Sequence, residues 1–201
     1  MTWIKTIAYE DSEGRLRQLY DRVKGPDNNI DNIMMAHSLR PHSMDGHMAL
    51  YKNVLHHSSN TVPKWFLETL GVLVSQINQC AYCAEHHFAG LRRLLSNDAQ
   101  ALAIRKALEE RSFADVFDKR NQSALTYALK LTEAAHTVAA ADIEAMRDAG
   151  FDDGQILEIN QVTAYFAYAN RTVLGLGVST DGDVLGMSPN NSDNPSDWSH
   201  R

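Results

Sequence analysis

Apolar residues recur at helical spacing along most of the chain. Between residues 11 and 24, for example, Leu16, Leu19 and Val23 are three or four positions apart, which places their side chains on one face of a helix. No segment shows a convincing strand-like alternation of apolar and polar residues. We therefore expect an all-α protein with eight or nine helices, over residues 11–24, 30–39, 43–57, 65–77, 80–95, 99–109, 121–135, 140–149 and 152–176.

Proline, glycine and capping residues indicate where several helices begin and end. Pro41 is expected to end the second helix, and Pro63 to occupy the first turn of the helix that follows it. Gly150 has the position of a glycine just beyond a helix C-terminus, and Asp152 or Asp153 can cap the long helix that comes next.

The pattern predicts a single all-α domain over residues 1–178, with an N-terminal helical arm over 1–58 and a core over 59–178. The composition of 179–201 shifts to Ser, Asp, Asn, Pro and Gly, which cannot build a core. We expect this tail to be extended, with its few apolar residues docked on a neighbouring subunit. An aromatic-rich final helix and such a tail favour a homo-oligomer.

Charge and hydropathy exclude several classes of partner. The 201 residues carry a formal net charge of −6 and no basic run longer than Arg92-Arg93, which argues against nucleic-acid binding. No apolar run approaches the roughly 18 residues that a membrane span needs, and the N-terminal residues do not resemble a secretory signal. We expect a cytoplasmic protein, where a close cysteine pair is catalytic, redox-active or metal-binding rather than a structural disulfide.

The sequence has two cysteines, Cys80 and Cys83, in a C-x-x-C motif that opens one of the predicted helices. Residues three apart are neighbours on a helix, with Cα atoms roughly 5 to 6 Å apart, so the two sulfurs can form a reversible disulfide. His87 follows Cys83 by four positions and lies one turn along the same face. It can take or return a thiol proton there.

Glu68 precedes Cys80 by twelve positions, and one continuous helix would hold it roughly 18 Å away. If the chain turns back near residues 76–78, Glu68 and His87 each lie about nine residues from the turn and face each other in an antiparallel helix pair. The carboxylate would then fix the tautomer of the imidazole and raise its basicity. The spacing fits a relay from Glu68 through His87 to a cysteine.

The same four residues could instead supply ligands to zinc. Structural zinc sites usually draw on two Cys/His pairs, however, and the sequence has no second C-x-x-C or H-x-x-x-H motif. A thioredoxin-like site is disfavoured because the surrounding βαβ pattern is absent. We therefore expect no bound metal and no cofactor.

Two neighbours of the motif have simpler interpretations. The side chain of His86 is rotated by about 100° from that of His87, which predicts a place at the solvent or at a subunit contact. Tyr82, between the cysteines, could hydrogen-bond near the thiols, although we expect it to serve in packing.

The pattern E-x(11)-C-x-x-C-x-x-x-H, preceded by V-S-x-I-N, resembles the alkylhydroperoxidase AhpD core of the carboxymuconolactone decarboxylase superfamily. The branch called peroxidase-related proteins is similar in four further features: the doubled histidine at 86–87, K-L-T at 130–132, G-F-D-D at 150–153 and N-R-T-V-L-G-L-G from 170. The likeness covers about residues 30–178.

This resemblance implies an AhpD-like helical bundle, assembled as a homo-oligomer (dimer, trimer or hexamer), and a thiol peroxidase of antioxidant defence that acts without haem or flavin. By position, Cys83 would be the peroxidatic thiol, Cys80 the resolving thiol, and Glu68 with His87 the proton relay. The implied partners are a hydroperoxide substrate and a dithiol reductant or reducing protein. The chain departs from some members at Tyr82, where they have histidine.

Three other functions remain open: a general thiol-disulfide oxidoreductase, a redox-sensing or binding oligomer, and a non-redox enzyme of the carboxymuconolactone decarboxylase type. The cysteine pair argues against the last, because that chemistry needs no dithiol. Two physical arguments about the roles of the thiols also disagree. A helix N-terminus favours the thiolate at Cys80, whereas a base at His87 favours Cys83. We assign the attack to Cys83, since a relay acts only on the thiol that it can reach.

Overall fold

The computed structural model describes residues 2–194 and 196–200, and within these ranges it is all-α, as predicted. Apart from two isolated β-bridges, the described residues form no β structure. The elements, in chain order, are α1 (Gly14–Val23), the 3₁₀ helix η1 (Pro26–Asn28), α2 (Asn32–Ala36), α3 (Pro41–Leu55), α4 (Lys64–Ile77), α5 (Ala81–Leu95), α6 (Asp98–Glu110), α7 (Lys119–Ala134), the 3₁₀ helix η2 (Ala135–Thr137), α8 (Ala140–Asp148) and α9 (Asp153–Leu176).

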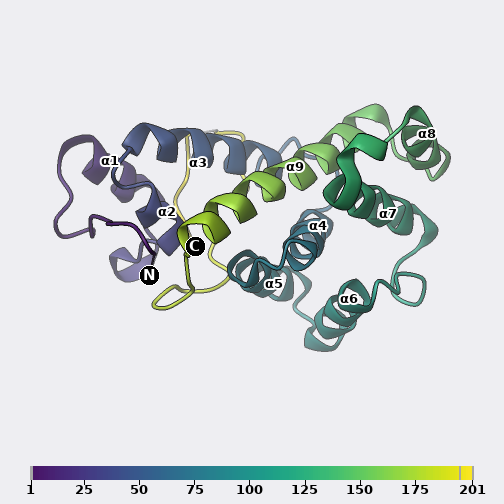
Figure 1. Cartoon of the computed structure of the whole chain (residues 1–201), viewed down its shortest axis with the longest axis horizontal. Coiled ribbons are helices and arrows are strands. Elements are labelled where there is room, and N and C mark those ends of the chain that lie inside the picture. The colour runs from purple at the N-terminus through teal and green to yellow at the C-terminus, as the bar shows by residue number, and fades with distance from the viewer. Residues whose placement is uncertain (1, 195, 201) are drawn as a thin grey trace.

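Helix α4 lies at the centre of the bundle, and α9 runs along the length of the molecule beside it (Figure 1). α4 contacts α3, α5, α6, α7 and α9. Every side chain from Phe66 to Ser75 is buried, as expected for a helix surrounded by other helices. The arm formed by α1, α2 and α3 lies at one end of the molecule, and α7 and α8 lie at the other (Figure 1).

The helix boundaries confirm some capping predictions and correct others. Asp152 accepts a hydrogen bond from the backbone N–H of Gln155 and caps α9, and Gly150 has the positive φ of +94° expected beyond a helix end. Pro41 does not end the second helix: it opens α3, because its fixed φ suits a first helical position. Pro63 is not in the first turn of α4 but precedes it as the N-cap, with a non-helical ψ of 134°.

The described residues of the C-terminal tail, 179–194 and 196–200, pack against the helices of their own chain. Buried Lys52 on α3 donates hydrogen bonds to Asn190, and the guanidinium of Arg22 lies 3.6 Å from the ring centroid of buried Trp198. Gly186 has a φ of +81°, and a Cβ there would lie 3.0 Å from the backbone of Ala89 on α5. The polar tail thus needs no core of its own, because the helices supply the apolar surface.

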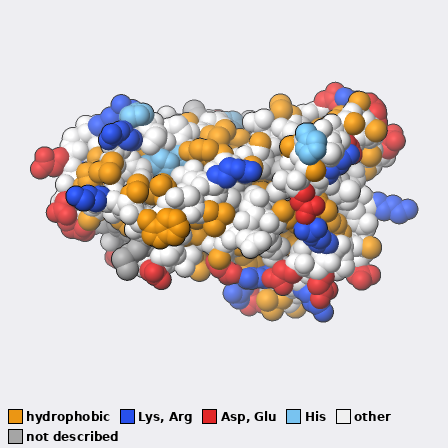
Figure 2. Space-filling view, in the orientation of Figure 1, with side chains coloured by type: hydrophobic (Ala, Val, Ile, Leu, Met, Phe, Trp, Pro, Cys, Tyr) orange, Lys and Arg blue, Asp and Glu red, His pale blue; other side chains and the backbone are white. Residues whose placement is uncertain are grey.

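The described surface is mixed in charge. On the face shown in Figure 2, Lys and Arg side chains are interspersed with acidic and apolar ones and form no continuous basic surface. None of the helices in the described ranges is both long and apolar enough to cross a lipid bilayer.

The crossing of α4 and α9 depends on a glycine. A Cβ at Gly71 on α4 would lie 2.3 Å from Cζ of Phe166 on α9, which is far inside van der Waals contact. The Phe166 ring in turn meets the ring of His87 edge to face, with centroids 4.5 Å apart. The absence of a side chain at Gly71 therefore lets α9 hold an aromatic ring against His87.

We predict that Gly71→Ala destabilises the protein by about 1–3 kcal/mol, because the buried Phe166 ring must move. Gly46→Ala is the matched control: Gly46 is also helical, and a Cβ there would meet nothing within 4 Å. This control should be neutral or stabilise by about 0.5–1 kcal/mol. Urea unfolding curves of both variants measure the difference, and equal effects would contradict the close approach.

Candidate functional site

A tight turn between α4 and α5 places the two cysteines. Gln79 has a φ of +56°, and the N–H of Cys80 donates to the carbonyl of Ser75 over 2.8 Å, so the chain reverses within a few residues. Cys80 is the N-cap of α5, and Cys83 lies in the first turn. The reversal falls close to the predicted position, and α4 and α5 pack against each other.

The turn brings Glu68 and His87 together, as the spacing predicts. Oε2 of Glu68 lies 2.6 Å from Nδ1 of His87, and the two side chains are only 3% and 14% exposed. If the carboxylate accepts the proton of Nδ1, Nε2 is left as the basic nitrogen. Edge-on contacts with the rings of Phe166 and Tyr51 fix the imidazole plane.

The two thiols are free, buried and different in their surroundings. Cys83 lines a pocket together with Glu68 and His87, whereas Cys80 does not line it. A hydrogen bond from Cys83 lowers the pKa of Cys80 below its ordinary value. The same hydrogen bond, together with desolvation, raises the pKa of Cys83 well above its ordinary value. Negative charge is thus more stable on Cys80, while Cys83 is the thiol that faces the pocket.

Asn170 on α9 is a site residue that the sequence did not reveal. Its side chain is fully buried: Oδ1 accepts from Asn78 over 2.9 Å and Nδ2 donates to Ser75 over 3.0 Å. The same amide is close enough to hydrogen-bond both thiols, and this contact lowers the pKa of each. Asn170 opens the N-R-T-V-L-G-L-G segment of the family resemblance, but the spacing gives it no role, because its partners lie 92 and 95 positions away.

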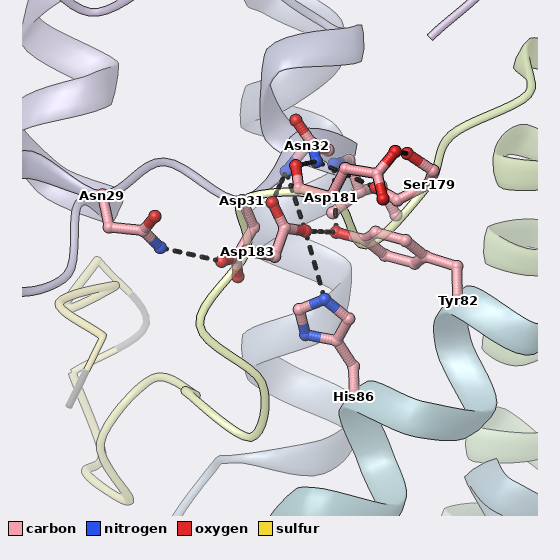
Figure 3. Close-up of polar contacts among 9 residues, drawn as sticks. Asn29, Asp31, Asn32, Tyr82, His86, Ser179, Asp181 and Asp183 are labelled. Carbon is pink, nitrogen blue, oxygen red and sulfur yellow. Dashed lines mark hydrogen bonds and ion pairs between the residues drawn. The ribbon is translucent and has the colours of Figure 1, made fainter. Parts of the chain in front are cut away.

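The lining of the pocket corrects the prediction for His86. His86 is buried rather than solvent-facing: it lines the pocket, stacks near Tyr82 with ring centroids 4.5 Å apart, and bonds Asp183 of the tail through Nε2 over 3.1 Å. Tyr82 also donates to Asp183, over 2.7 Å (Figure 3). Nothing in the sequence pattern predicts this position for Asp183, since it lies in a polar tail that the pattern predicts to be extended.

The site therefore combines a thiol that faces a pocket, a neighbouring thiol, and a carboxylate–imidazole pair. Such a set can form and hydrolyse bonds to sulfur, transfer protons and cycle between dithiol and disulfide. Within the described ranges, no group of three or more His, Cys, Asp and Glu side chains is arranged to hold a metal ion.

Neither a protein-family model nor a curated protein matches this chain. Several solved structures do. One is an uncharacterized peroxidase-related protein with an alkylhydroperoxidase AhpD core from Ralstonia eutropha JMP134; it is 25% identical, with a TM-score of 0.77 over 89% of this chain and 91% of its own. A second uncharacterized peroxidase-related protein, from Silicibacter sp. TM1040, is 26% identical, with a TM-score of 0.66 over 73% and 74% of the two chains.

The debrominase Bmp8 also has this fold, with a TM-score of 0.70 over 87% of this chain and 89% of its own, at 15% identity. Its name shows that the fold carries more than one chemistry. The two peroxidase-related proteins are more similar to this chain, because they share its fold and also about a quarter of its aligned residues. On this fold and these likenesses, the chain belongs to the AhpD-like superfamily.

Proposed function

We propose that this protein is a thiol-dependent peroxidase that reduces hydroperoxides through a dithiol/disulfide cycle of Cys83 and Cys80. The observation that carries the proposal is the place of Cys83. It is the one cysteine of the pair that lines the pocket, and Glu68 and His87 line the same pocket. A peroxide bound there would meet a nucleophile, a proton relay and a second thiol.

In the first step the Cys83 thiolate attacks the terminal oxygen of the hydroperoxide. The O–O bond breaks, an S–O bond forms, and Cys83 becomes a sulfenic acid. The alkoxide leaves with a proton supplied by His87, which gives an alcohol. The sulfur is oxidised by two electrons, and the peroxide is reduced by two.

In the second step Cys80 attacks the sulfur of the sulfenic acid. An S–S bond forms, the S–O bond breaks, and water leaves after the hydroxide takes a proton. An external dithiol then reduces the disulfide by thiol exchange and becomes a disulfide itself. One hydroperoxide and one dithiol thus give one alcohol, one water and one oxidised donor.

The opposite pKa shifts of the two thiols suit this division of labour. Because the hydrogen bond with Cys80 and burial raise the pKa of Cys83, this thiol needs a base, and His87 lies one helical turn away with Glu68 behind it. The lowered pKa of Cys80 keeps a thiolate available to resolve the sulfenic acid.

We predict opposite outcomes for the two cysteine variants in single-turnover reactions with a hydroperoxide. Cys83→Ser should consume no peroxide, whereas Cys80→Ser should react once and keep a sulfenic acid at Cys83 that mass spectrometry detects after trapping. Trapped sulfenate at Cys80 in Cys83→Ser would reverse the roles. If wild type consumes no hydroperoxide with any dithiol, the function is thiol exchange or redox sensing instead.

The relay gives a second prediction. His87→Ala and Glu68→Gln should each slow the first oxidation by about a hundredfold or more, since general-base catalysis contributes that much or more. Their circular dichroism spectra should stay those of wild type. The exposed residues His42 and Glu10 provide controls, and His42→Ala and Glu10→Gln should react at the wild-type rate. A relay variant that oxidises at the wild-type rate would remove its residue from the mechanism.

The buried side-chain amide of Asn170 gives a third prediction. Asn170→Ala removes the hydrogen bond that lowers both thiol pKa values. Cys80, the thiol with the lower pKa, should therefore titrate at higher pH than in wild type. Below the wild-type pKa both proteins are protonated, and the difference appears only as the pH rises through it. Ultraviolet absorbance of the thiolate against pH measures this shift. The exposed Asn53→Ala is the control, and an unshifted titration in Asn170→Ala would contradict the contact.

A further inference from the structure

One carboxylate in the pocket has no part in the proposed peroxidase cycle. Asp31 lines the pocket together with Cys83 and His86. It precedes α2 as the N-cap, where an aspartate side chain normally accepts a hydrogen bond from the first turn. Asp31 makes no such bond, and among the described residues its carboxylate accepts one hydrogen bond, a long one of 3.3 Å from Asn29.

Asp183 of the tail, and not Asp31, binds the backbone N–H at the start of α2. Its two oxygens accept from the backbone N–H of Asn32 over 3.0 and 3.1 Å, and Oδ2 also meets Tyr82 Oη and His86 Nε2 (Figure 3). The side chain of Asp183 is 2% exposed. Asp183 therefore has three donors, whereas Asp31 beside it has one distant donor and keeps acceptor capacity for a group in the pocket.

Asp31 also brings negative charge to the pocket. Desolvation raises its pKa to about 6, with His86 lowering the value and Asp183 raising it, so the carboxyl is mostly ionised at neutral pH. Burial lowers the pKa of His47 to about 3 and that of His200 to about 4, so these two lining imidazoles are uncharged. No Lys or Arg occurs among the pocket-lining residues that the structure describes.

The walls beside this carboxylate are aromatic. Tyr51 and Tyr165 line the pocket and stack on each other, with centroids 5.4 Å apart and planes 19° from parallel. A largely desolvated carboxylate with one long hydrogen bond is stabilised by a donor or a cation and repels a second carboxylate. The pocket thus has apolar walls and a carboxylate, that of Asp31, which can accept a hydrogen bond or pair with a positive charge.

We propose that Asp31 binds the polar end of the substrate, so that the protein prefers hydroperoxides carrying an ammonium group over those carrying a carboxylate. This inference rests on the proposed peroxidase function and names the substrate class of the same site. Asp31 selects the substrate, and Cys83 reacts with its peroxide group.

Three cumene hydroperoxides test the charge preference on one frame: unsubstituted, para-aminomethyl and para-carboxylate. In single-turnover reactions the reduced wild-type protein should react about tenfold faster with the ammonium compound than with the carboxylate, as expected for one partly screened charge pair. Asp31→Asn keeps the size of the side chain and removes its charge, so most of this ratio should disappear. Asp115→Asn, at an exposed aspartate outside the pocket, should keep the ratio.

The corresponding cumyl alcohols cannot be reduced by the thiols and measure binding alone, by calorimetry. Tighter binding of the ammonium alcohol by wild type but not by Asp31→Asn supports the inference. Equal affinities in wild type, or a ratio of rates that Asp31→Asn leaves unchanged, overturn it. If no hydroperoxide reacts while the ammonium alcohol still binds through Asp31, the peroxidase function fails and the binding site stands.

Discussion

The buried pairing of Glu68 with His87 sets the geometry on which the rest of the site depends. Glu68 lies within the segment of α4 whose every side chain is buried, and an unpaired carboxylate there would cost several kcal/mol. His87 meets this carboxylate at 2.6 Å from the neighbouring helix. The pairing therefore fixes how α5 lies along α4, and with it the place of both cysteines.

One hydrogen bond between the two thiols shifts their pKa values in opposite directions. A hydrogen bond joins Cys83 and Cys80, and it raises the pKa of Cys83 and lowers that of Cys80. The thiol with the raised pKa faces the pocket, where a base is available, and the thiol with the lowered pKa lies behind it at the N-terminus of α5. Asn170 adds a donor to this pair from a third helix, α9. In the proposed cycle, this arrangement keeps Cys80 available to attack the oxidised Cys83.

The C-terminal tail forms part of the pocket wall and determines which carboxylate faces the pocket. Gly186, Ser188 and His200 form part of its wall, and Asp183 holds the tail to α2 and α5. Since Asp183 serves as the anchor, Asp31 is left facing the pocket. Proteins that share the helical bundle but differ in this segment would keep the reactive thiol and bind different molecules. Such variation is consistent with a fold that includes both peroxidase-related proteins and a debrominase.

The sequence by itself determined the helices and the meeting of Glu68 with His87 near the cysteines, because both depend on local spacing. The positions of Leu16 and Leu19 define a helix face, and the separations of Glu68, Cys83 and His87 around one turn define which side chains can meet. The boundaries at Pro41 and Pro63 were harder to predict, since a proline is compatible with both the end of one helix and the start of the next. Only the tertiary structure decided which distant residues join the site. Asn170, Asp183 and the buried face of His86 owe their roles to partners 92 to 151 positions away, and no local pattern carries that information.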